Sequence, residues 1–500
     1  MLSTQAPGEL VVHPRQVFAS RPVIATALLL ALGVAVQRVP GLERARIFTA
    51  PEGEAAADVA QLVADDQKLG ESTLATESHF REELALPEQI RVTERKGPIA
   101  AKQDDFKIPA IDAEQPPVPL IDPESLSQFY ASLAKTAIKR DGQITRIVYH
   151  GDSLVASDYV TATLRRKLQT QFGDAGHGFM LVANAWPAYF HNDVFRFASR
   201  GWVVSRVVGP YLKDGLYGLG GVSFKAAPGV RARFGTAEKG SYGRHVSRFR
   251  IAYLSQPHGG DLKLSVDGKL VETISTRADA KTSGFHDVVV SDGEHQLEIL
   301  TAGGMTRVFG VAMERDQAGV VLDAIGIQGA RVRFLDKQDD THWAQQLAWR
   351  DPKLIVYQFG ANESGDGFAY SMEDYHRTMK EVLLQAKAAV PGADCLVLGA
   401  MDRARKEKDW MITVPVIPLI VDEQEKTAHE VGCAFWNTFD AMGGKGSMAK
   451  WVRRGLGQAD LTHPTSVGAE IIGNWVYQAL ISGYESYRKA AAPKRAPGTP

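Results

Sequence analysis

An α/β pattern interrupted by a long β-rich stretch constrains the fold of this chain more than any other feature. Short apolar segments, each typical of a buried strand, alternate with helical periodicity; they lie at 146–150, 320–326, 354–360, 395–400 and 433–438. Five such strands joined by helices predict an α/β fold with a doubly wound parallel sheet. Because the interruption follows the first strand, we expect one α/β domain that is split by an inserted domain.

The interruption covers residues 185–319 and consists of short runs of alternating apolar and polar residues, such as RFRIAYLS, LKLSVDG and HQLEIL. Asp267-Gly268 and Asp292-Gly293 are typical of hairpins and turns. Many short strands with few helical patterns predict a β-sandwich or jelly roll.

The first 39 residues are expected to form a signal or anchor segment. Residues 22–36 read PVIATALLLALGVAV and follow Arg15 and Arg21. Positive charge before such an apolar stretch is typical of an export signal or a membrane anchor. The stretch is short for a bilayer and no clear small-residue cleavage site follows it, so both a cleaved peptide and an uncleaved anchor stay open. A buried helix is the structural alternative.

Residues 40–120 are rich in Ala, Glu, Gln and Asp and end in a proline cluster at 116–119, so we expect a flexible spacer. Asp122 and Pro123 then match a helix cap and first turn, and apolar residues follow at helical spacing. The folded region is therefore expected to begin near residue 121.

The charge balance and the cysteine content exclude several classes of protein. The chain has 57 Lys and Arg against 58 Asp and Glu, so its net charge of −1 provides no basic field that would attract nucleic acid. Its two cysteines, Cys395 and Cys433, cannot form a disulfide framework or a four-cysteine zinc site. We expect both to be buried thiols.

Ser153 lies in the segment Gly151–Leu154, directly after the first predicted strand. Parallel sheets build their sites beyond the carboxyl ends of the strands. A serine at such a strand-to-helix turn can be exposed with its backbone N–H free, which suits a nucleophile that also helps to bind an oxyanion. A Gly-Asp-Ser tripeptide also occurs by chance, so this segment alone does not identify an active site.

Asp460 and His463 lie in the segment DLTHP before the last predicted helix. An Asp three residues before a His can bond Nδ1 of the imidazole. This bond fixes the tautomer and stabilises the imidazolium that forms when a serine gives up its proton. A helix cap is the structural alternative.

Asn362 and Gly329 are candidate oxyanion donors, each following a predicted strand. The carboxamide of Asn362 can donate to a developing negative charge. Gly329 can present a backbone N–H with no side chain in the way. A turn is the commoner role for either residue alone. All the candidate segments fall at strand ends of one sheet, and this placement favours a common site.

These segments resemble the four sequence blocks of the SGNH, or GDSL, hydrolase superfamily; they are GDSL at 151–154, the glycine of IQGA at 327–330, GAN at 360–362 and DLTHP at 460–464. The resemblance covers residues 121–486 and implies a flavodoxin-like sheet. It is closer to the peptidoglycan O-acetylesterases, which carry a carbohydrate-binding-like β-sandwich between the serine and glycine blocks. The implied hydrolase parts are residues 121–184 and 320–486, and we expect residues 487–500 to be a disordered tail.

The resemblance implies a serine esterase that needs no metal and no organic cofactor. Ser153 would be the nucleophile, His463 the base and Asp460 its orienting partner, and the oxyanion donors would be Gly329 and Asn362. Glu363 departs from the pattern, since many members of the superfamily have Asp there. The position lies beside the reacting groups, so we do not expect the change to disable the site.

The implied substrate is an acetylated polysaccharide, most simply peptidoglycan. The protein would then be periplasmic or extracellular, with attachment to the inner membrane through residues 22–36. Aromatic side chains near the start of the insert could stack on sugars, although the core is their commoner location. Two alternatives stay open, namely an O-acetyltransferase with the same triad and a noncatalytic glycan-binding protein with a hydrolase fold.

Overall fold

The structure is a computed structural model that describes residues 110–111, 114–187 and 189–491. These residues all belong to one compact unit. The expected signal or anchor segment, with its apolar stretch at 22–36, lies outside the described residues. Among the residues that are described, no helix is long and apolar enough to cross a membrane.

A parallel five-stranded sheet forms the centre of the α/β domain, as predicted. Its strand order is β13-β1-β14-β15-β18, and the strands are β1 Ile144–Gly151, β13 Gly319–Gly326, β14 Leu354–Gln358, β15 Asp394–Leu398 and β18 Ala434–Trp436. Gly151 at the end of β1 is in register with Gly326 and with Gln358. The carboxyl ends of three neighbouring strands therefore lie level at one edge of the sheet.

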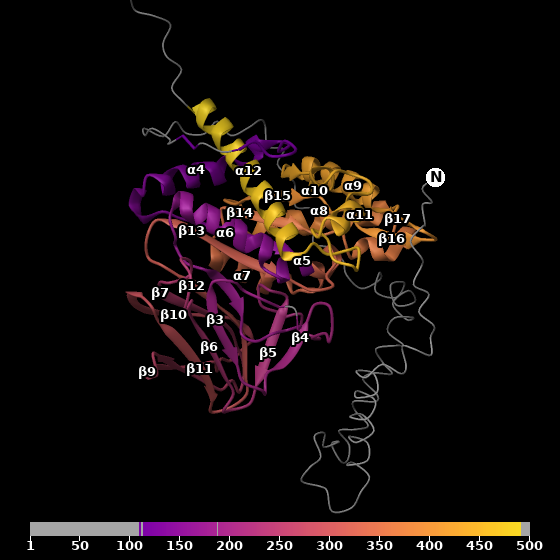
Figure 1. The fold of residues 1–500 in the computed structure, drawn as a ribbon. Coiled ribbons are helices and arrows are strands. Elements are labelled where there is room, and N and C mark those ends of the chain that lie inside the picture. The colour runs from indigo at the N-terminus through magenta and orange to yellow at the C-terminus, as the bar shows by residue number, and fades with distance from the viewer. Residues whose placement is uncertain (1–109, 112–113, 188, 492–500) are drawn as a thin grey trace, which may run out of the picture. The chain divides into compact units, whose positions relative to one another are not determined.

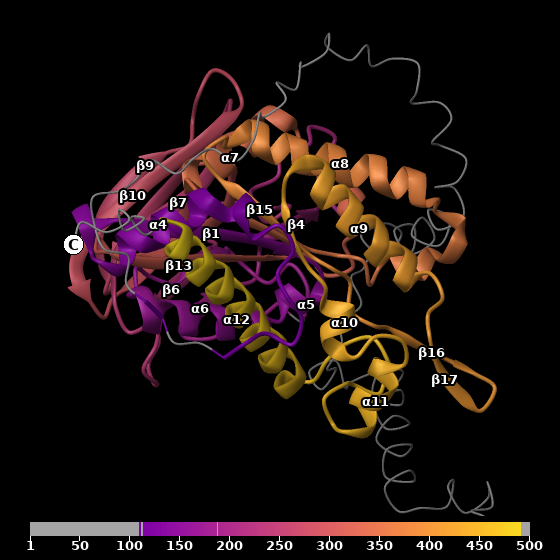
Figure 2. The same ribbon diagram turned by 90° about the horizontal axis from the view of Figure 1, so that it is seen from above.

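Helices cover both faces of this sheet (Figure 2). Successive side chains of β1 point to opposite faces, so Tyr149 packs in a core with α4, α6 and α12, and Val148 packs in a second core with α7, α8 and α9. The helices are α4 Ser127–Ala137, α5 Ser153–Ala156, α6 Tyr159–Phe172, α7 Asp340–Arg350, α8 Met372–Ala389, α9 Ile417–Val431, α10 Thr438–Met442, α11 Ser447–Arg453 and α12 Ser466–Ala491. A hairpin of β16 (Ala404–Glu407) and β17 (Trp410–Thr413) follows β15.

The insert between β1 and β13 contains two antiparallel sheets (Figure 1). One sheet has the order β10-β7-β12-β5-β4, with β2 also paired to β12; its strands are β2 Gly178–Leu181, β4 Val203–Arg206, β5 Val222–Ala226, β7 Val246–Ser255, β10 Thr282–Gly293 and β12 Thr306–Glu314. The other has the order β3-β6-β11-β8-β9; its strands are β3 Val194–Ala198, β6 Arg231–Thr236, β8 Asp261–Val266, β9 Lys269–Ser275 and β11 Gln296–Ala302. Buried side chains of both sheets share one apolar core, which confirms an inserted β-rich domain.

Strand β2 joins the insert to the α/β domain. It falls within residues 121–184, which we assigned to the first hydrolase part, but it pairs with β12 of the insert. Its Phe179 N–H also donates to Asp323 Oδ1 of β13 at 2.7 Å. The first strand of the insert's sheet is therefore fixed to the neighbour of the serine-bearing strand.

Cys395 and Cys433 form a disulfide, so the expectation of two buried thiols is wrong. Both residues are buried. They stand at the start of β15 and just before β18, and the pairing of Leu396 with Ala434 places them opposite each other on adjacent strands. Their Cα atoms are 4.8 Å apart, within the range that a disulfide can bridge. Sequence spacing cannot show that these two strands are neighbours.

Two expectations about segment ends are wrong in part. Residues 114–120 were to be a flexible spacer, but the carbonyl of Val118 accepts a hydrogen bond from Trp436, and Glu114 accepts one from Gln478. Proline has no N–H to satisfy, so an extended Pro-rich segment can dock through its carbonyls. Residues 487–491 continue α12 rather than starting a disordered tail.

Candidate active site

Ser153 is the first residue of the short helix α5, just beyond the end of β1. Two glycines allow α5 to start this close to the sheet. A Cβ on Gly326 would lie 1.9 Å from the backbone nitrogen of Ala156, and one on Gly151 would lie 2.3 Å from Cγ2 of Val155 in α5. Any side chain at either position would push the helix away. The serine is therefore held at the edge of the sheet, partly exposed.

Asp152 fixes this turn and also reaches the next loop. Its Oδ1 accepts a hydrogen bond from Leu154 N at 3.0 Å, and its Oδ2 accepts one from Asn362 Nδ2 at 3.2 Å. Burial raises the pKa of Asp152 to about 6, against the opposing effects of the Leu154 N–H and the His463 ring. We assigned no role to this carboxyl from the sequence, although its place before Ser153 was a signal.

The loop before α12 presents His463. Asp460 Oδ1 accepts hydrogen bonds from Thr462 N at 2.9 Å and from His463 N at 3.0 Å. Burial on its own would raise the pKa of Asp460, but these bonds and the His463 ring hold it below its usual value. Asp460 thus stays ionised at neutral pH while it shapes the turn that carries the histidine.

Ser153, His463 and Asp460 form one hydrogen-bonded chain. Ser153 Oγ lies 2.7 Å from His463 Nε2, and His463 Nδ1 lies 2.7 Å from Asp460 Oδ2. A carboxylate can only accept, so Nδ1 carries the proton and the lone pair of Nε2 faces the serine hydroxyl. The side chains of His463 and Asp460 are 37% and 46% exposed. The chain can therefore take the serine proton in a place that water can reach.

The two candidate oxyanion donors lie in adjoining loops. Asn362 Nδ2 donates to Ala330 O at 2.9 Å as well as to Asp152. Gly329 precedes Ala330, is exposed and has a φ of +79°, a conformation that favours glycine. The structure thus brings Asn362 to the serine loop directly, and Gly329 to it through the Ala330 contact.

Arg403 is a site residue that the sequence analysis missed. It follows β15 at the same edge of the sheet, which was the available signal. Its Nη1 donates to Ala361 O and to Ser364 Oγ, both at 3.0 Å, and its Nε donates to Thr462 Oγ1 at 3.1 Å. Arg403 therefore ties the asparagine loop to the histidine loop.

Comparisons with known proteins show which fold this chain has. No protein-family profile matches the sequence, and no curated protein matches it. A solved structure of a peptidoglycan O-acetylesterase aligns over 72% of this chain and 96% of that chain, with 22% identity and a TM-score of 0.61. The chain has the SGNH hydrolase fold. A family two carbohydrate esterase from Cellvibrio japonicus aligns at 12% identity over 59% of this chain and 98% of that chain, with a TM-score of 0.24.

A groove in the insert adjoins α5, the helix that carries Ser153. The backbone N–H of Phe190 donates to Ala156 O of α5 at 3.1 Å. From there a cavity of about 610 Å³ extends over β3 and β4, with aromatic and cationic side chains along it; these include Phe190, Phe197, Trp202, Arg196 and Arg200. Phe190 is 55% exposed and Phe197 is 45% exposed.

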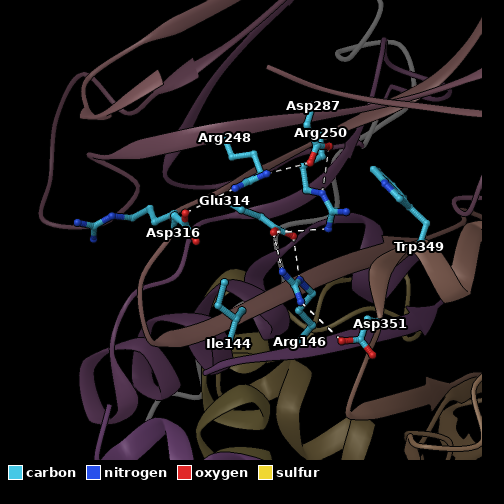
Figure 3. A pocket seen from close by; sticks show the side chains of 10 residues that line it. Ile144, Arg146, Arg248, Arg250, Asp287, Glu314, Asp316, Trp349 and Asp351 are labelled. Carbon is cyan, nitrogen blue, oxygen red and sulfur yellow. Dashed lines mark hydrogen bonds and ion pairs between the residues drawn. The ribbon is translucent and has the colours of Figure 1, made fainter. Parts of the chain in front are cut away.

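A second pocket, of about 320 Å³, lies where the insert meets the amino end of β1 in the SGNH domain (Figure 3). Arginines and carboxylates line it and pair with one another. The buried carboxylate of Glu314 accepts hydrogen bonds from Arg146 Nη2 at 2.9 Å and from Arg350 Nη2 at 2.6 Å. Ser153 stands at the opposite end of β1, so this pocket is an ion-pair network between two domains rather than part of the candidate site around Ser153.

Asp158 and His177, which are buried, and His191, which is half-buried and lines the groove, have ligand atoms within 4.8 Å of one another. The carboxylate of Asp158 is already paired with Arg165 at 3.0 Å. The two imidazoles are hydrogen-bonded to each other at 3.0 Å, and burial lowers the pKa of both. These contacts make the group an internal polar network that supports the loop before the groove.

Proposed function

We propose that this protein is a serine esterase that removes O-acetyl groups from an extracytoplasmic polysaccharide, most simply acetylated peptidoglycan. The observation that carries the proposal is the hydrogen-bonded chain from Ser153 through His463 to Asp460. The SGNH fold and the similarity to a peptidoglycan O-acetylesterase support it.

In the proposed first step, Ser153 Oγ attacks the ester carbonyl carbon while His463 Nε2 takes the hydroxyl proton. The carbonyl oxygen becomes an oxyanion, for which the N–H groups of Ser153 and Gly329 and the Asn362 amide are the donors. The two hydrogens of Asn362 Nδ2 are donated to Asp152 and Ala330 O in the structure, so one of these bonds is exchanged for the bond to the oxyanion. The imidazolium then returns its proton to the sugar oxygen as the C–O bond breaks. This step leaves an acetyl-serine and a free sugar hydroxyl.

In the second step, His463 Nε2 takes a proton from water while the water oxygen attacks the acetyl carbon. Collapse of the second oxyanion breaks the bond to Ser153 Oγ, which regains its proton from His463, and acetate leaves. The exposure of His463 and Asp460 supports hydrolysis over transfer to a sugar, because an acyltransferase must keep water from the acyl-enzyme.

The groove that adjoins α5 supports an extended substrate. Exposed rings of Phe190 and Phe197 can stack on sugar faces, while Arg196 and Arg200 can donate to hydroxyl, carbonyl or carboxylate oxygens of a glycan. A chain laid along this groove would place an acetylated sugar near Ser153.

The Cys395–Cys433 disulfide supports a location outside the cytoplasm, since disulfides persist in oxidising compartments. The apolar stretch at residues 22–36 agrees with export. We therefore propose a periplasmic or extracellular protein, and attachment to the inner membrane through residues 22–36 remains part of this proposal.

The test is mass analysis of O-acetylated peptidoglycan and of other acetylated glycans after incubation with purified protein, with Ser153→Ala as the control. We expect loss of acetyl groups and release of acetate with the wild type alone. Equal release by both proteins would exclude the serine mechanism. Acetylation of an added oligosaccharide acceptor, without free acetate, would identify a transferase instead.

A further inference from the structure

The carboxylate of Glu363 joins the two loops that carry the oxyanion donors. Glu363 follows Asn362 at the start of the η6 turn (Glu363–Ala369) and is 2% exposed. Its Oε1 accepts a hydrogen bond from Val332 N at 2.8 Å, and its Oε2 accepts one from Gly360 N at 3.0 Å. Val332 belongs to the loop after β13, and Gly360 to the loop after β14.

The Gly329 loop depends on such contacts for its position. A Cβ built on Gly329 would meet no atom within 4 Å, so nothing packs against this residue on the side where a side chain would lie. Two contacts follow Gly329 in the sequence. Ala330 O accepts a hydrogen bond from Asn362 Nδ2, and Val332 N donates one to Glu363 Oε1. The Asn362–Glu363 pair therefore supplies two of the anchors of the Gly329 loop, beside the Arg331–Asp366 ion pair and the bond from Ile327 N to Gly151 O.

We propose that Glu363 is a positioning residue whose two carboxylate oxygens set the spacing between the Gly329 N–H and the Asn362 amide, the two oxyanion donors that come from different loops. This inference rests on the proposed function. A displacement of about 1 Å in a group that stabilises the transition state can cost roughly 100-fold in rate. Substrate binding before reaction does not require the same spacing.

The chemistry of the side chain explains why a carboxylate stands here. Two backbone N–H groups need two acceptor oxygens, and the carboxyl group of Glu363 supplies both when it is ionised, above its pKa of about 7. A glutamine at position 363 would keep the shape but turn an NH₂ group toward one of the N–H groups. An aspartate would be one methylene shorter and could not span the same gap without moving a loop.

Glu363→Gln is the first test. We expect kcat for a small acetate ester to fall roughly 10- to 100-fold while KM changes less than about twofold. The matched control is Asp394→Asn, another buried carboxylate that accepts a backbone N–H, from Phe129 at 2.8 Å, but at the amino end of β15. This control should keep the wild-type kcat even where it lowers the melting temperature.

A double-mutant cycle separates positioning from general destabilisation. If Glu363 acts through the oxyanion donors, Glu363→Gln should lower kcat less than about threefold in an Asn362→Ala background. An undiminished effect in that background, or an unchanged kcat in the single variant, would overturn the inference. Ser153→Ala is assayed alongside, since its full activity would instead overturn the proposed function.

Val332→Pro tests the same contact from the other side. The substitution removes the backbone N–H of residue 332, which donates to Glu363, and leaves the carboxylate of Glu363 in place. Val332 is the first residue of the η5 turn (Val332–Lys337), and Arg331 before it is extended at φ −106° and ψ 156°, as the residue before a proline must be. We expect kcat to fall with KM unchanged; a wild-type kcat would contradict the inference even if Glu363→Gln does not fold.

Discussion

The Oγ of Ser153 lies 2.7 Å from the Nε2 of His463, although 310 positions separate the two residues in the chain. Ser153 follows the end of strand β1 at the edge of the sheet, and His463 lies at the same edge, in the loop before α12. The whole insert lies between them in sequence. The meeting of these two side chains is therefore a property of the sheet and not of any local motif.

Asp460→Asn should lower kcat roughly 10⁴-fold with little change in KM. The amide can donate to Nδ1 of His463, which would favour the tautomer whose Nε2 carries the proton and cannot accept one from Ser153. Hydrolysis of a small acetate ester measures the effect. A loss of less than tenfold would show that the carboxylate does not orient the ring.

Phe190→Ala should raise KM for acetylated polysaccharide roughly three- to tenfold and leave a small acetate ester largely unaffected, because the lost ring would contact only an extended chain. Val289→Ala is the control, since Val289 is an exposed apolar residue of the insert outside the groove. Equal KM values for the polysaccharide in both variants would place the glycan elsewhere.

Loss of the Cys395–Cys433 disulfide should lower the free energy of unfolding by about 2 to 4 kcal/mol. The bond closes a loop with a sequence separation of 38, so it restricts the unfolded chain. Thermal unfolding with and without a reductant measures the change. A Cys395→Ser/Cys433→Ser double variant should not respond to the reductant, and a wild type that is equally indifferent would contradict the prediction.

Glu314→Ala should destabilise the fold by roughly 3 to 5 kcal/mol. It leaves Arg146 without its buried partner between the insert and the sheet (Figure 3), and it removes one of the two buried carboxylates that pair with Arg350, the other being Asp323. Denaturant unfolding provides the measurement. Asp316→Ala is the control: Asp316 is 77% exposed and pairs with Arg248 at 3.6 Å, so its removal should cost under about 1 kcal/mol.

The stability of the wild type relative to Glu363→Gln should fall as pH rises. Burial raises the pKa of Glu363 to about 7, against the opposing effect of its backbone hydrogen bonds. The folded protein therefore keeps a proton that the unfolded chain loses near pH 4.5. The contribution of Glu363 to the free energy of unfolding is complete below pH 4.5. It declines by on the order of 3 kcal/mol as the pH rises to about 7. Denaturant unfolding across this range measures it, and a difference that does not change with pH would contradict the prediction.

Local patterns were sufficient to predict the layers of the fold. The apolar segments at 146–150 and 354–360 are buried on both faces of a parallel sheet, so their composition alone indicates central strands. The alternation in the insert follows from sheets that bury one face. Ser153, Asp460 and His463 were found because each lies at a strand end or before a helix. A short motif next to such an element indicates where its residues lie in the fold.

What the sequence by itself determined is thus the order of elements and the residue types at the sheet edge. The tertiary structure alone decided which strands are neighbours, and with that the Cys395–Cys433 bond and the pairing of β2 with β12. It also decided that Arg403 and Glu363 connect the loops that carry the candidate site residues. The physical reason is that these contacts join groups distant in the chain, whose distance and burial arise only when the elements pack together.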